Sequence, residues 1–386
     1  MRPMKLAGAE LMFGQGALSH LRTLKGHRAV VVMRGDRFTR NGILDVVGGH
    51  LEAAGIEWTV FDGVEPDPKF ASVKAGTEVM RTFQPDLIIA LGGGSAMDAA
   101  KAMWVLYEHP ELTELADLLP PNKIPPLRRK ARMVCIPSTS GSASEVSRSI
   151  VITDDATGTK HGVGDLEMIP DIAICDPIVT ATMSPRVTAD SGMDALTHAI
   201  EAYVSNRANY LSDILAIAAA TDIVKYLPKA CTDGSNLEYR ERLLNASMVA
   251  GLAFTNVSLG IVHSMAHSLG SLFGIAHGLA NAILLPGVVR FNSAEPVARQ
   301  RYARLAESIG AEDLTSALAS LCESVNVPSS LKELIPDESA FLNKLPQLVT
   351  MAQADGCTKT NPVIPTAEQF RELYMTAYCG QVGEPR

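Results

Sequence analysis

The feature that most constrains the fold is an alternation of strand and helix patterns that fills the first half of the chain and then stops. Runs of β-branched and other apolar residues lie at 27–35, 56–64, 85–95 and 132–137, and helical patterns separate them at 43–55, 74–84 and 97–109. Strands that are apolar on both faces and alternate with helices predict a parallel sheet covered by helices. Further strand-like runs at 147–154 and 161–177 are expected at the margin of that sheet.

After about Pro177 the pattern changes to one of long helices. Segments rich in alanine and leucine, with the 3.6-residue period of a helix, occur at 188–205, 210–228, 238–254 and 298–310, and strand-like runs nearly vanish. We therefore predict an α/β domain with a parallel, Rossmann-like sheet over residues 1–180, followed by an all-helical domain over residues 181–386.

The composition limits the classes of partner. The 386 residues carry a net charge of −8, which argues against a nucleic-acid or anionic-membrane partner because both select a basic face. No apolar run reaches the ~18–20 residues that span a bilayer, and the N-terminal residues lack the pattern of a signal peptide. The six cysteines are scattered without a CxxC pair, as is typical of reduced thiols. A cytoplasmic enzyme is the expectation.

A glycine-rich turn follows the third apolar run, in "LIIALGGGSAMDAAKA". It places Gly92, Gly93, Gly94 and Ser95 between a buried strand and the start of a helix. Glycines allow close approach of a ligand, and a helix N-terminus offers unpaired N–H groups, which suits a pyrophosphate. The alternative is a turn that only reverses the chain. Asp98, one turn into the helix, is expected to accept hydrogen bonds from the loop or from a hydroxyl.

A second cluster of polar residues follows the next strand, in "IPSTSGSASEVS". Ser138, Thr139 and Ser142 come where the strand ends, and ligand crevices of parallel sheets lie outside the carboxyl ends of their strands. The alternative is a helix N-terminus in which Ser142 and Glu145 form a capping box. The two interpretations are compatible.

Histidines and one aspartate suggest a metal site in the helical half. Asp194 and His198, four residues apart, share one helix face and can chelate one ion, although an isolated DxxxH pattern is more often a surface hydrogen bond. Downstream, "LGIVHSMAHSLGSLFGIAHG" adds His263, His267 and His277. One carboxylate with three imidazoles is a ligand set for Fe²⁺ or Zn²⁺. His263 and His267 are also four residues apart, so the spacing does not identify which histidine is left over.

Several segments together resemble the iron-containing (group III) alcohol dehydrogenase family. They are "GGGSAMDAAKAMW", "IPSTSGSASEVS", "GMDALTHAIEAY", "LGIVHSMAHSLG" and "AHGLANAILLP". Each is weak alone, but they are specific in combination. The match is collinear from "LMFGQGAL" near the N-terminus to "DGCTKTNP" near the C-terminus, and so covers nearly the whole chain.

The resemblance implies a dehydroquinate-synthase-like architecture. In it, the N-terminal half binds a nicotinamide dinucleotide, the helical half holds the metal, and the substrate lies in the cleft between. The implied metal ligands are Asp194, His198, His263 and His277. His267 corresponds to a nearby histidine that is not a ligand and helps to move the hydroxyl proton.

The resemblance also implies the contacts of the dinucleotide. Gly92, Gly93, Gly94 and Ser95 match the pyrophosphate loop, in which Asp98 is conventional. The implied contacts nearer the nicotinamide and the ribose are Ser138, Thr139, Ser142 and Lys160.

Two departures from the family pattern concern the dinucleotide. Ala96 replaces a frequent proline, and Ser138, Ser142 and Ala143 replace the usual residues of the second motif, all with small changes in shape. More consequential is the end of the first strand, where members that prefer NAD tend to carry an aspartate. Here Gly35 is nearest that position and Asp36 is one residue beyond it, whereas Arg34 and Arg37 are available to hold a phosphate. The choice between NAD and NADP therefore stays open.

The expected function is that of a metal-dependent, NAD(P)-linked alcohol dehydrogenase or aldehyde reductase. The metal, Fe²⁺ or else Zn²⁺, would polarise the oxygen of a short-chain primary alcohol or aldehyde. Phe254 and the residues around "SLFG" are expected to line an apolar substrate pocket, and a homodimer or larger homo-oligomer is expected. The alternatives are a dehydroquinate synthase or glycerol dehydrogenase-like enzyme acting on a polyol, a reductase of an aldehyde with an anionic tail, and a non-catalytic binding protein.

Overall fold

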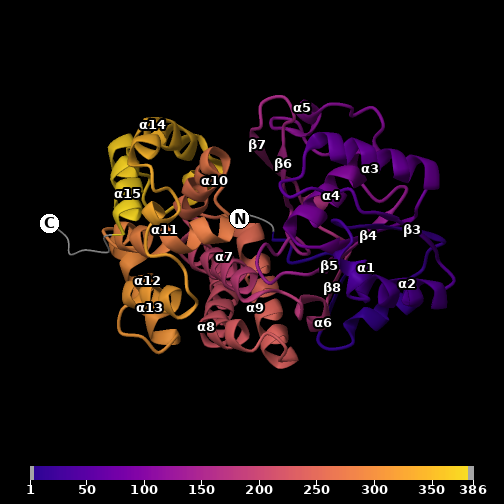
Figure 1. Cartoon of the computed structure of the whole chain (residues 1–386), viewed down its shortest axis with the longest axis horizontal. Helices are drawn as coiled ribbons and strands as arrows, with labels where there is room; N and C mark the ends of the chain where they lie inside the picture. Colours follow the sequence, from indigo (N-terminus) through magenta and orange to yellow (C-terminus); the bar gives the residue numbers. More distant parts are fainter. Residues whose placement is uncertain (1–3, 381–386) are drawn as a thin grey trace. The chain divides into compact units, whose positions relative to one another are not determined.

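The computed structural model of the protein describes residues 4–380. The chain forms two compact units, Met1–Thr182 and Met183–Arg386. The first is coloured from indigo to magenta in Figure 1, and the second continues from there to yellow.

The N-terminal unit is built on a parallel sheet of six strands, which confirms the predicted fold class of this half. The strand order is β1-β8-β5-β4-β2-β3, and every neighbouring pair is parallel. The strands are β1 (Glu10–Phe13), β2 (Arg28–Val32), β3 (Glu57–Phe61), β4 (Leu87–Gly92), β5 (Arg132–Pro137) and β8 (Ile172–Cys175).

Alternate residues of these strands enter two different apolar cores. In β2, Ala29 and Val31 belong to the core that includes α2 (Ile43–Ala53). Val30 and Val32 belong to the opposite core, which includes α3 (Phe70–Phe83) and α4 (Gly94–Glu108). Successive side chains of a strand point to opposite faces, so a sheet covered on both sides needs strands that are apolar at every position. The short helices of this unit are α1 (Arg37–Arg40), α5 (Leu115–Leu118) and α6 (Pro177–Thr180).

Four strands differ from the prediction, namely β1, β8, β6 (Ser149–Thr153) and β7 (Lys160–Gly164). The 161–177 run was expected at the margin of the sheet, but its second part is β8, which lies inside the sheet between β1 and β5. Its first part is β7, which pairs antiparallel with β6 in a separate sheet. The edge strand β1 was not predicted, because its apolar run is only three residues long, from Leu11 to Phe13, and its four residues are only partly buried or exposed.

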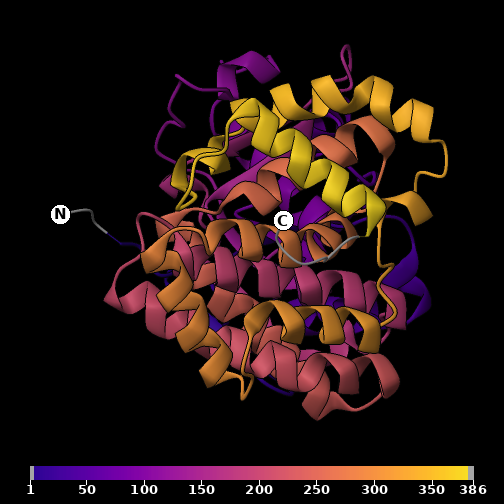
Figure 2. The same ribbon diagram turned by 90° about the vertical axis from the view of Figure 1, so that its left-hand side faces the viewer.

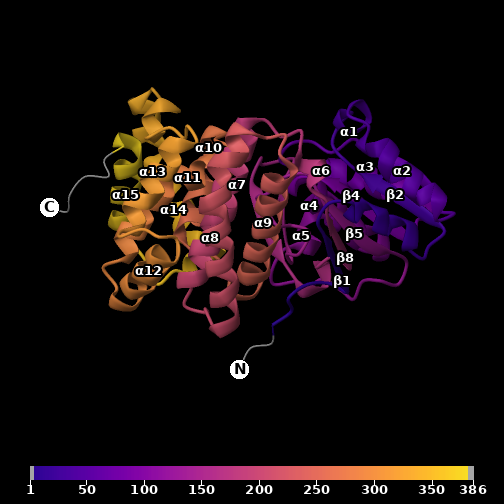
Figure 3. The same cartoon turned by 90° about the horizontal axis from the view of Figure 1, so that it is seen from below.

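The C-terminal unit is helical throughout its described residues, as predicted. Helices α7, α8 and α9 pack against one another, and α11 packs against both α7 and α10. This unit faces the viewer in Figure 2, and Figure 3 shows α7, α8 and α9 side by side. The helices are α7 (Pro185–Val204), α8 (Tyr210–Thr232), α9 (Leu237–Val257), α10 (Ile261–Phe273), α11 (His277–Asn292), α12 (Pro296–Ser308), α13 (Leu314–Ser324), α14 (Glu338–Ala354) and α15 (Ala367–Cys379).

Within residues 4–380, no single helix has the length and apolar character needed to cross a bilayer, although the bent pair α9 and α10 would meet that test together.

Candidate metal and dinucleotide sites

Helix α7 presents Asp194 and His198 on one face, one turn apart. Both are buried, with 6% and 5% of their surface exposed. Helix α11 reaches this face because its second residue is a glycine. A Cβ on Gly278 would lie 2.0 Å from the carbonyl oxygen of Asp190 and 3.3 Å from the Cβ of Asp194. The absence of a side chain at Gly278 therefore lets His277, the first residue of α11, come close to Asp194.

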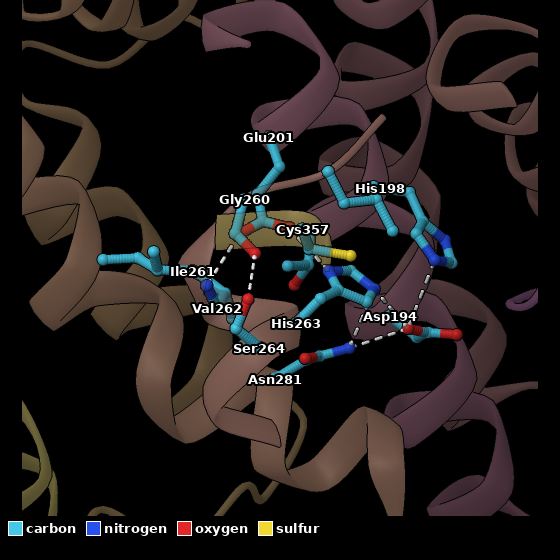
Figure 4. A network of polar contacts seen from close by, with 12 residues as sticks. Asp194, His198, Glu201, Gly260, Ile261, Val262, His263, Ser264, Asn281 and Cys357 are labelled. Atoms are coloured by element: carbon cyan, nitrogen blue, oxygen red, sulfur yellow. Dashed lines mark hydrogen bonds and ion pairs between the residues drawn. The ribbon is translucent and has the colours of Figure 1, made fainter. Parts of the chain in front are cut away.

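Three imidazoles converge on one carboxylate oxygen. The Nε2 atoms of His198, His263 and His277 lie 3.7, 3.6 and 3.4 Å from Oδ1 of Asp194. Figure 4 shows Asp194 between His198 and His263. One ligand atom each from Asp194, His263 and His277 forms a group in which all separations are within 4.8 Å. The structure thus brings together all four residues that the resemblance implied as ligands.

The separations suit a metal ion better than direct hydrogen bonds. An N–H···O hydrogen bond is ordinarily about 2.7–3.2 Å long. Two ligand atoms that are each ~2.1 Å from a tetrahedrally coordinated ion lie about 3.4 Å apart. The three Nε2 atoms are 3.4 to 3.7 Å from the carboxylate oxygen. Imidazole nitrogens with one carboxylate are also the donors that Fe²⁺ and Zn²⁺ accept, so the residues present fit such an ion.

The charges of Asp194 and His277 support the same conclusion. Burial would raise the pKa of Asp194, but the neighbouring imidazoles of His198 and His277 hold it well below its ordinary value, so the carboxylate stays anionic. Burial lowers the pKa of His277, which favours the neutral imidazole that binds metals. His263 differs: burial disfavours its charge, yet the carboxylates of Glu201 and Asp194 raise its pKa to about 9, so this ring must release a proton when a metal binds.

Asn281, on α11, occupies the centre of this group. Its Nδ2 donates to Oδ1 of Asp194 at 2.8 Å and lies 3.2 Å from Nε2 of His277 and 3.4 Å from Nε2 of His263. Its Oδ1 is buried without a hydrogen-bond partner among the described residues. The NH2 group of Asn281, which carries a partial positive charge, therefore lies next to the anionic oxygen of Asp194 and the Nε2 atoms of His263 and His277.

His267 has a different environment from His263. Its Nδ1 is 2.8 Å from Oδ2 of Asp355, and its ring stacks on that of His277 with the centroids 5.3 Å apart. The other oxygen of Asp355 accepts from the backbone N–H of Cys357 at 2.8 Å. Burial favours the protonated carboxyl, but the hydrogen bond and charge of His267 hold the pKa of Asp355 below its ordinary value. The group of donor atoms within 4.8 Å of one another contains neither His267 nor His198, but Nε2 of His198 lies 3.7 Å from Oδ1 of Asp194.

Phe254, which was expected to line a substrate pocket, lies beside the metal ligands. Its ring stacks on His198 at a centroid distance of 4.4 Å, and His198 stacks in turn on His263 at 4.6 Å. These stacked rings limit the rotation of the His198 imidazole. They also form an apolar wall on one side of the four ligands.

In the N-terminal unit, the glycine loop lies at a topological switch point. From β2 the chain continues outward to β3, then crosses to the other side of β2 to form β4 and continues to β5. The carboxyl ends of β2 and β4 are therefore neighbours whose connections leave in opposite directions, which is where open parallel sheets bind ligands. Gly35 follows β2, and Gly93 and Gly94 open α4, whose N-terminus provides free N–H groups.

The serine- and threonine-rich segment faces this loop. The backbone N–H of Ser138 donates to the carbonyl of Gly92 at 2.8 Å. A Cβ on Gly93 would lie 3.3 Å from the side chain of Thr139, and one on Gly94 would lie 3.1 Å from that of Ser142. The capping-box alternative is wrong, because no helix follows Ser142. Its hydroxyl instead accepts from the N–H of Ser144 in a turn.

Asp98 and Lys160 make other contacts within the N-terminal unit. Asp98 accepts from the hydroxyl of Ser144 at 2.7 Å and from the N–H of Val151 at 2.9 Å, so its bonds connect α4 to the serine-rich segment and to β6. Lys160 pairs with Asp67 at 2.6 Å. The structure brings Gly92 to Ser95, Ser138, Thr139 and Ser142 together, while Asp98 lies behind them. The assignment of these residues to the dinucleotide stays a prediction.

Three contacting residues were not singled out from the sequence: Glu201, Asn281 and Asp355. Glu201 carried a usable signal, since it follows Asp194 by seven residues and so shares its helix face. Asn281 follows His277 by four residues and carried the same kind of signal. Asp355 is distant in sequence from the histidine it contacts, and no spacing rule connects the two.

Comparison with known proteins gives similarity along nearly the whole chain. The family model for iron-containing alcohol dehydrogenase matches residues 8–177, and that for the Fe-containing alcohol dehydrogenase family, C-terminal, matches residues 188–378. The chain is 43% identical over 380 residues to the NADPH-dependent butanol dehydrogenase of Clostridium saccharobutylicum, covering 96% of this chain and 97% of that protein. It is 37% identical over 390 residues to the 1,3-propanediol dehydrogenase of Citrobacter freundii, covering 95% and 96%. The solved iron-containing alcohol dehydrogenase of Thermococcus thioreducens matches with a TM-score of 0.91 at 35% identity, covering 97% of this chain and 99% of that one.

Proposed function

The chain belongs to the iron-containing alcohol dehydrogenase family, and on that premise we propose that it interconverts a short-chain primary alcohol and its aldehyde. The observation that carries the proposal is the convergence of three imidazole Nε2 atoms on Oδ1 of Asp194. The named substrates of two relatives, butanol and 1,3-propanediol, are both short primary alcohols. The apolar wall formed by Phe254 suits an alkyl chain.

We propose that Asp194, His198, His263 and His277 hold a divalent metal, with Fe²⁺ favoured by the family and Zn²⁺ as the alternative. When bound, the metal polarises the substrate oxygen, and the nicotinamide carries the hydride. The protein contributes an anionic carboxylate and imidazoles that are already oriented before the ion binds. Dialysis against a chelator, followed by reloading with each metal, tests which ion supports turnover.

We propose His267 as the residue that moves the hydroxyl proton. Asp355 accepts a hydrogen bond from Nδ1 of His267, which leaves Nε2 as the nitrogen with a free lone pair. About a third of the His267 side chain is exposed, 36% against 2% for His263, so a proton taken up at Nε2 has a route to water. An imidazole with this orientation suits general acid–base catalysis.

We propose that the N-terminal unit binds the dinucleotide and that NADP is preferred over NAD. Gly92, Gly93, Gly94 and Ser95 would receive the pyrophosphate, with Ser138, Thr139, Ser142 and Lys160 nearer the ribose and nicotinamide. No carboxylate stands at Gly35 to repel a 2′-phosphate, and the relative from C. saccharobutylicum is named as NADPH-dependent. Arg34 is exposed beside Gly35 and can pair with a phosphate.

One assay tests the reaction and the cofactor together. The change in nicotinamide absorbance is followed with purified protein, Fe²⁺ or Zn²⁺, NADPH or NADH, and a panel of short aldehydes. We expect turnover with short linear aldehydes and a higher kcat/KM for NADPH than for NADH. The Gly35→Asp variant should reverse that cofactor ratio. An unchanged ratio would reject the proposed basis of the preference.

A cytoplasmic location and a homodimeric assembly are also proposed. All six cysteines are free thiols in the structure, as suits a reducing compartment. Two-fold dimers are the commonest assembly of such enzymes. Light scattering after gel filtration measures the mass of the assembly directly.

A further inference from the structure

We propose that Glu201 is a positioning residue of the metal centre, which fixes His263 in the orientation and tautomer that the ion requires. This inference rests on the proposed role of His263 as a ligand. Glu201 contacts the proposed ligands through its hydrogen bond to His263, so it would act through that ring.

The two oxygens of Glu201 hold two adjacent residues of α10. Oε2 accepts from Nδ1 of His263 at 2.5 Å, and Oε1 accepts from the backbone N–H of Val262 at 2.7 Å. Both side chains are almost fully buried, with 4% of Glu201 and 2% of His263 exposed. One carboxylate therefore fixes the imidazole ring and also the start of the helix that carries it (Figure 4).

Helix geometry explains why Glu201 reaches this position. Asp194, His198 and Glu201 stand at i, i+4 and i+7 on α7 and so share one face. The partner segment begins at Gly260, where a Cβ would lie 2.8 Å from Oε1 of Glu201 and 2.7 Å from Oδ1 of Asn361. The glycine permits this close approach. A carboxylate at the N-terminus of a helix is also favoured by the helix dipole.

The hydrogen bond to Glu201 determines which nitrogen of His263 is available. A neutral imidazole has one N–H and one lone pair. With the N–H at Nδ1 directed to Glu201, the lone pair is at Nε2, which faces Asp194 at 3.6 Å. Carboxylates that hold a ligating histidine in this way raise its basicity and reduce the number of ring orientations that must be given up on metal binding.

The test is the metal affinity of Glu201→Gln, measured by competition with a chromophoric chelator for Zn²⁺ and for Fe²⁺. A glutamine side chain offers one acceptor and one donor where glutamate offers two acceptors. It therefore cannot accept from Val262 through one atom and from His263 through the other, as glutamate does. We expect a dissociation constant that is about 10–100-fold higher than that of the wild type.

A matched control is Asp213→Asn, the same change of carboxylate to amide on the neighbouring helix. Asp213 is partly buried and pairs with Arg301, and it contacts none of the four ligands. We expect its metal affinity to equal that of the wild type. The unfolding temperature of each metal-free variant is measured as well, because a purely structural role would lower that temperature and leave the dissociation constant unchanged.

A second measurement uses the wild-type protein and does not depend on whether the variant folds. A buried imidazole N–H held by a carboxylate gives a proton resonance well downfield of the backbone amides. We expect such a signal in the zinc-loaded protein, assigned to His263 because it persists in His267→Ala, which should keep the metal but lacks the other imidazole beside a carboxylate.

The outcomes separate this inference from the proposed function. A wild-type protein that binds neither metal would reject the proposed metal centre itself. In a second case the wild type binds metal, while the dissociation constant of Glu201→Gln is within twofold of the wild-type value, or no higher than that of Asp213→Asn. Either result would overturn the role of Glu201 without rejecting the metal centre. Absence of the downfield resonance would also overturn it. Selective weakening in Glu201→Gln supports it.

Discussion

His263 and His267 lie one turn apart on α10, and each contacts a different carboxylate. The carboxylate beside His263 is Glu201 on α7, whereas the one beside His267 is Asp355, which follows α14. Sequence spacing treats the two histidines as equivalent, because both follow the same helical period. We expect their roles to differ because residues from distant parts of the chain orient them differently.

This difference leads to opposite results for two alanine variants. His263→Ala removes a proposed ligand, so both bound metal and activity should be lost. His267→Ala should retain the metal, while turnover falls by ~10²–10⁴-fold, the usual contribution of a proton-transfer residue. Metal content after gel filtration, measured beside kcat, checks both. Loss of metal from the His267 variant alone would exchange the two assignments.

Asp355→Asn should give a weaker form of the His267→Ala result. The single amide oxygen can still accept the N–H of His267 if the bond from the N–H of Cys357 is given up, but it carries no charge to stabilise the imidazole when that ring takes up a proton. We expect metal content to be unchanged and kcat to fall by only part of the ~10²–10⁴-fold loss expected for His267→Ala. A kcat equal to that of the wild type would show that Asp355 has no part in proton transfer.

At the scale of elements, the contact between α11 and α7 depends on a missing side chain. In Gly278→Ala, the new Cβ would meet the carbonyl of Asp190 at 2.0 Å, so α11 must move away from α7. We expect a loss of stability of about 1–3 kcal/mol, as for other overpacked sites, together with weaker metal binding because His277 moves with the helix. Unfolding by urea and the chelator assay measure the two effects.

Gly287→Ala is the matched control for that change. Gly287 lies in the same helix, and a Cβ there would meet nothing within 4 Å. The substitution should be neutral or stabilising by up to about 1 kcal/mol, since alanine is the better helix former. Equal destabilisation of both variants would mean that the close approach of α11 to α7 is not the reason why a side chain at position 278 is unfavourable.

The elements were largely predictable, and the reasons for the exceptions are local. Strands with every residue apolar, such as Leu87–Gly92, could be recognised because burial on both faces leaves a continuous signal. The strand Glu10–Phe13 gave too short a signal, because it lies at an edge of the sheet, is only partly buried and has only three apolar residues in a row. The proposed ligands came from a family resemblance, whereas Glu201 and Asp355 became visible only when the packing placed each beside a histidine.

At the scale of the whole molecule, one buried carboxyl makes stability depend on pH. Burial raises the pKa of Glu145 from 4.5 to about 7, with Lys101 opposing the shift. Between these two values the folded protein binds more protons than the unfolded chain, so stability falls as the pH rises through this window. Above pH ~7 the full cost of about 3 kcal/mol persists.

Glu145→Gln should remove that dependence. We expect the variant to gain stability over the wild type between about pH 5 and pH 8, by up to about 3 kcal/mol. Urea unfolding followed by tryptophan fluorescence measures the stability of the N-terminal unit, which contains Glu145. Both tryptophans of the chain, Trp58 and Trp104, lie in that unit. If the free energy of unfolding differs between variant and wild type by the same amount at about pH 5 and pH 8, Glu145 is not the group that makes stability depend on pH.

The single face of α7 that carries Asp194, His198 and Glu201 also restricts how the chain can change over evolution. Each residue of a helix is turned by about 100° from the one before it. An insertion or deletion of one residue between Asp194 and Glu201 would keep a helical sequence but rotate everything after it away from the histidines of α10 and α11. Variation in length within this family is therefore expected in loops and at helix ends, whereas this stretch of α7 should change only by substitution.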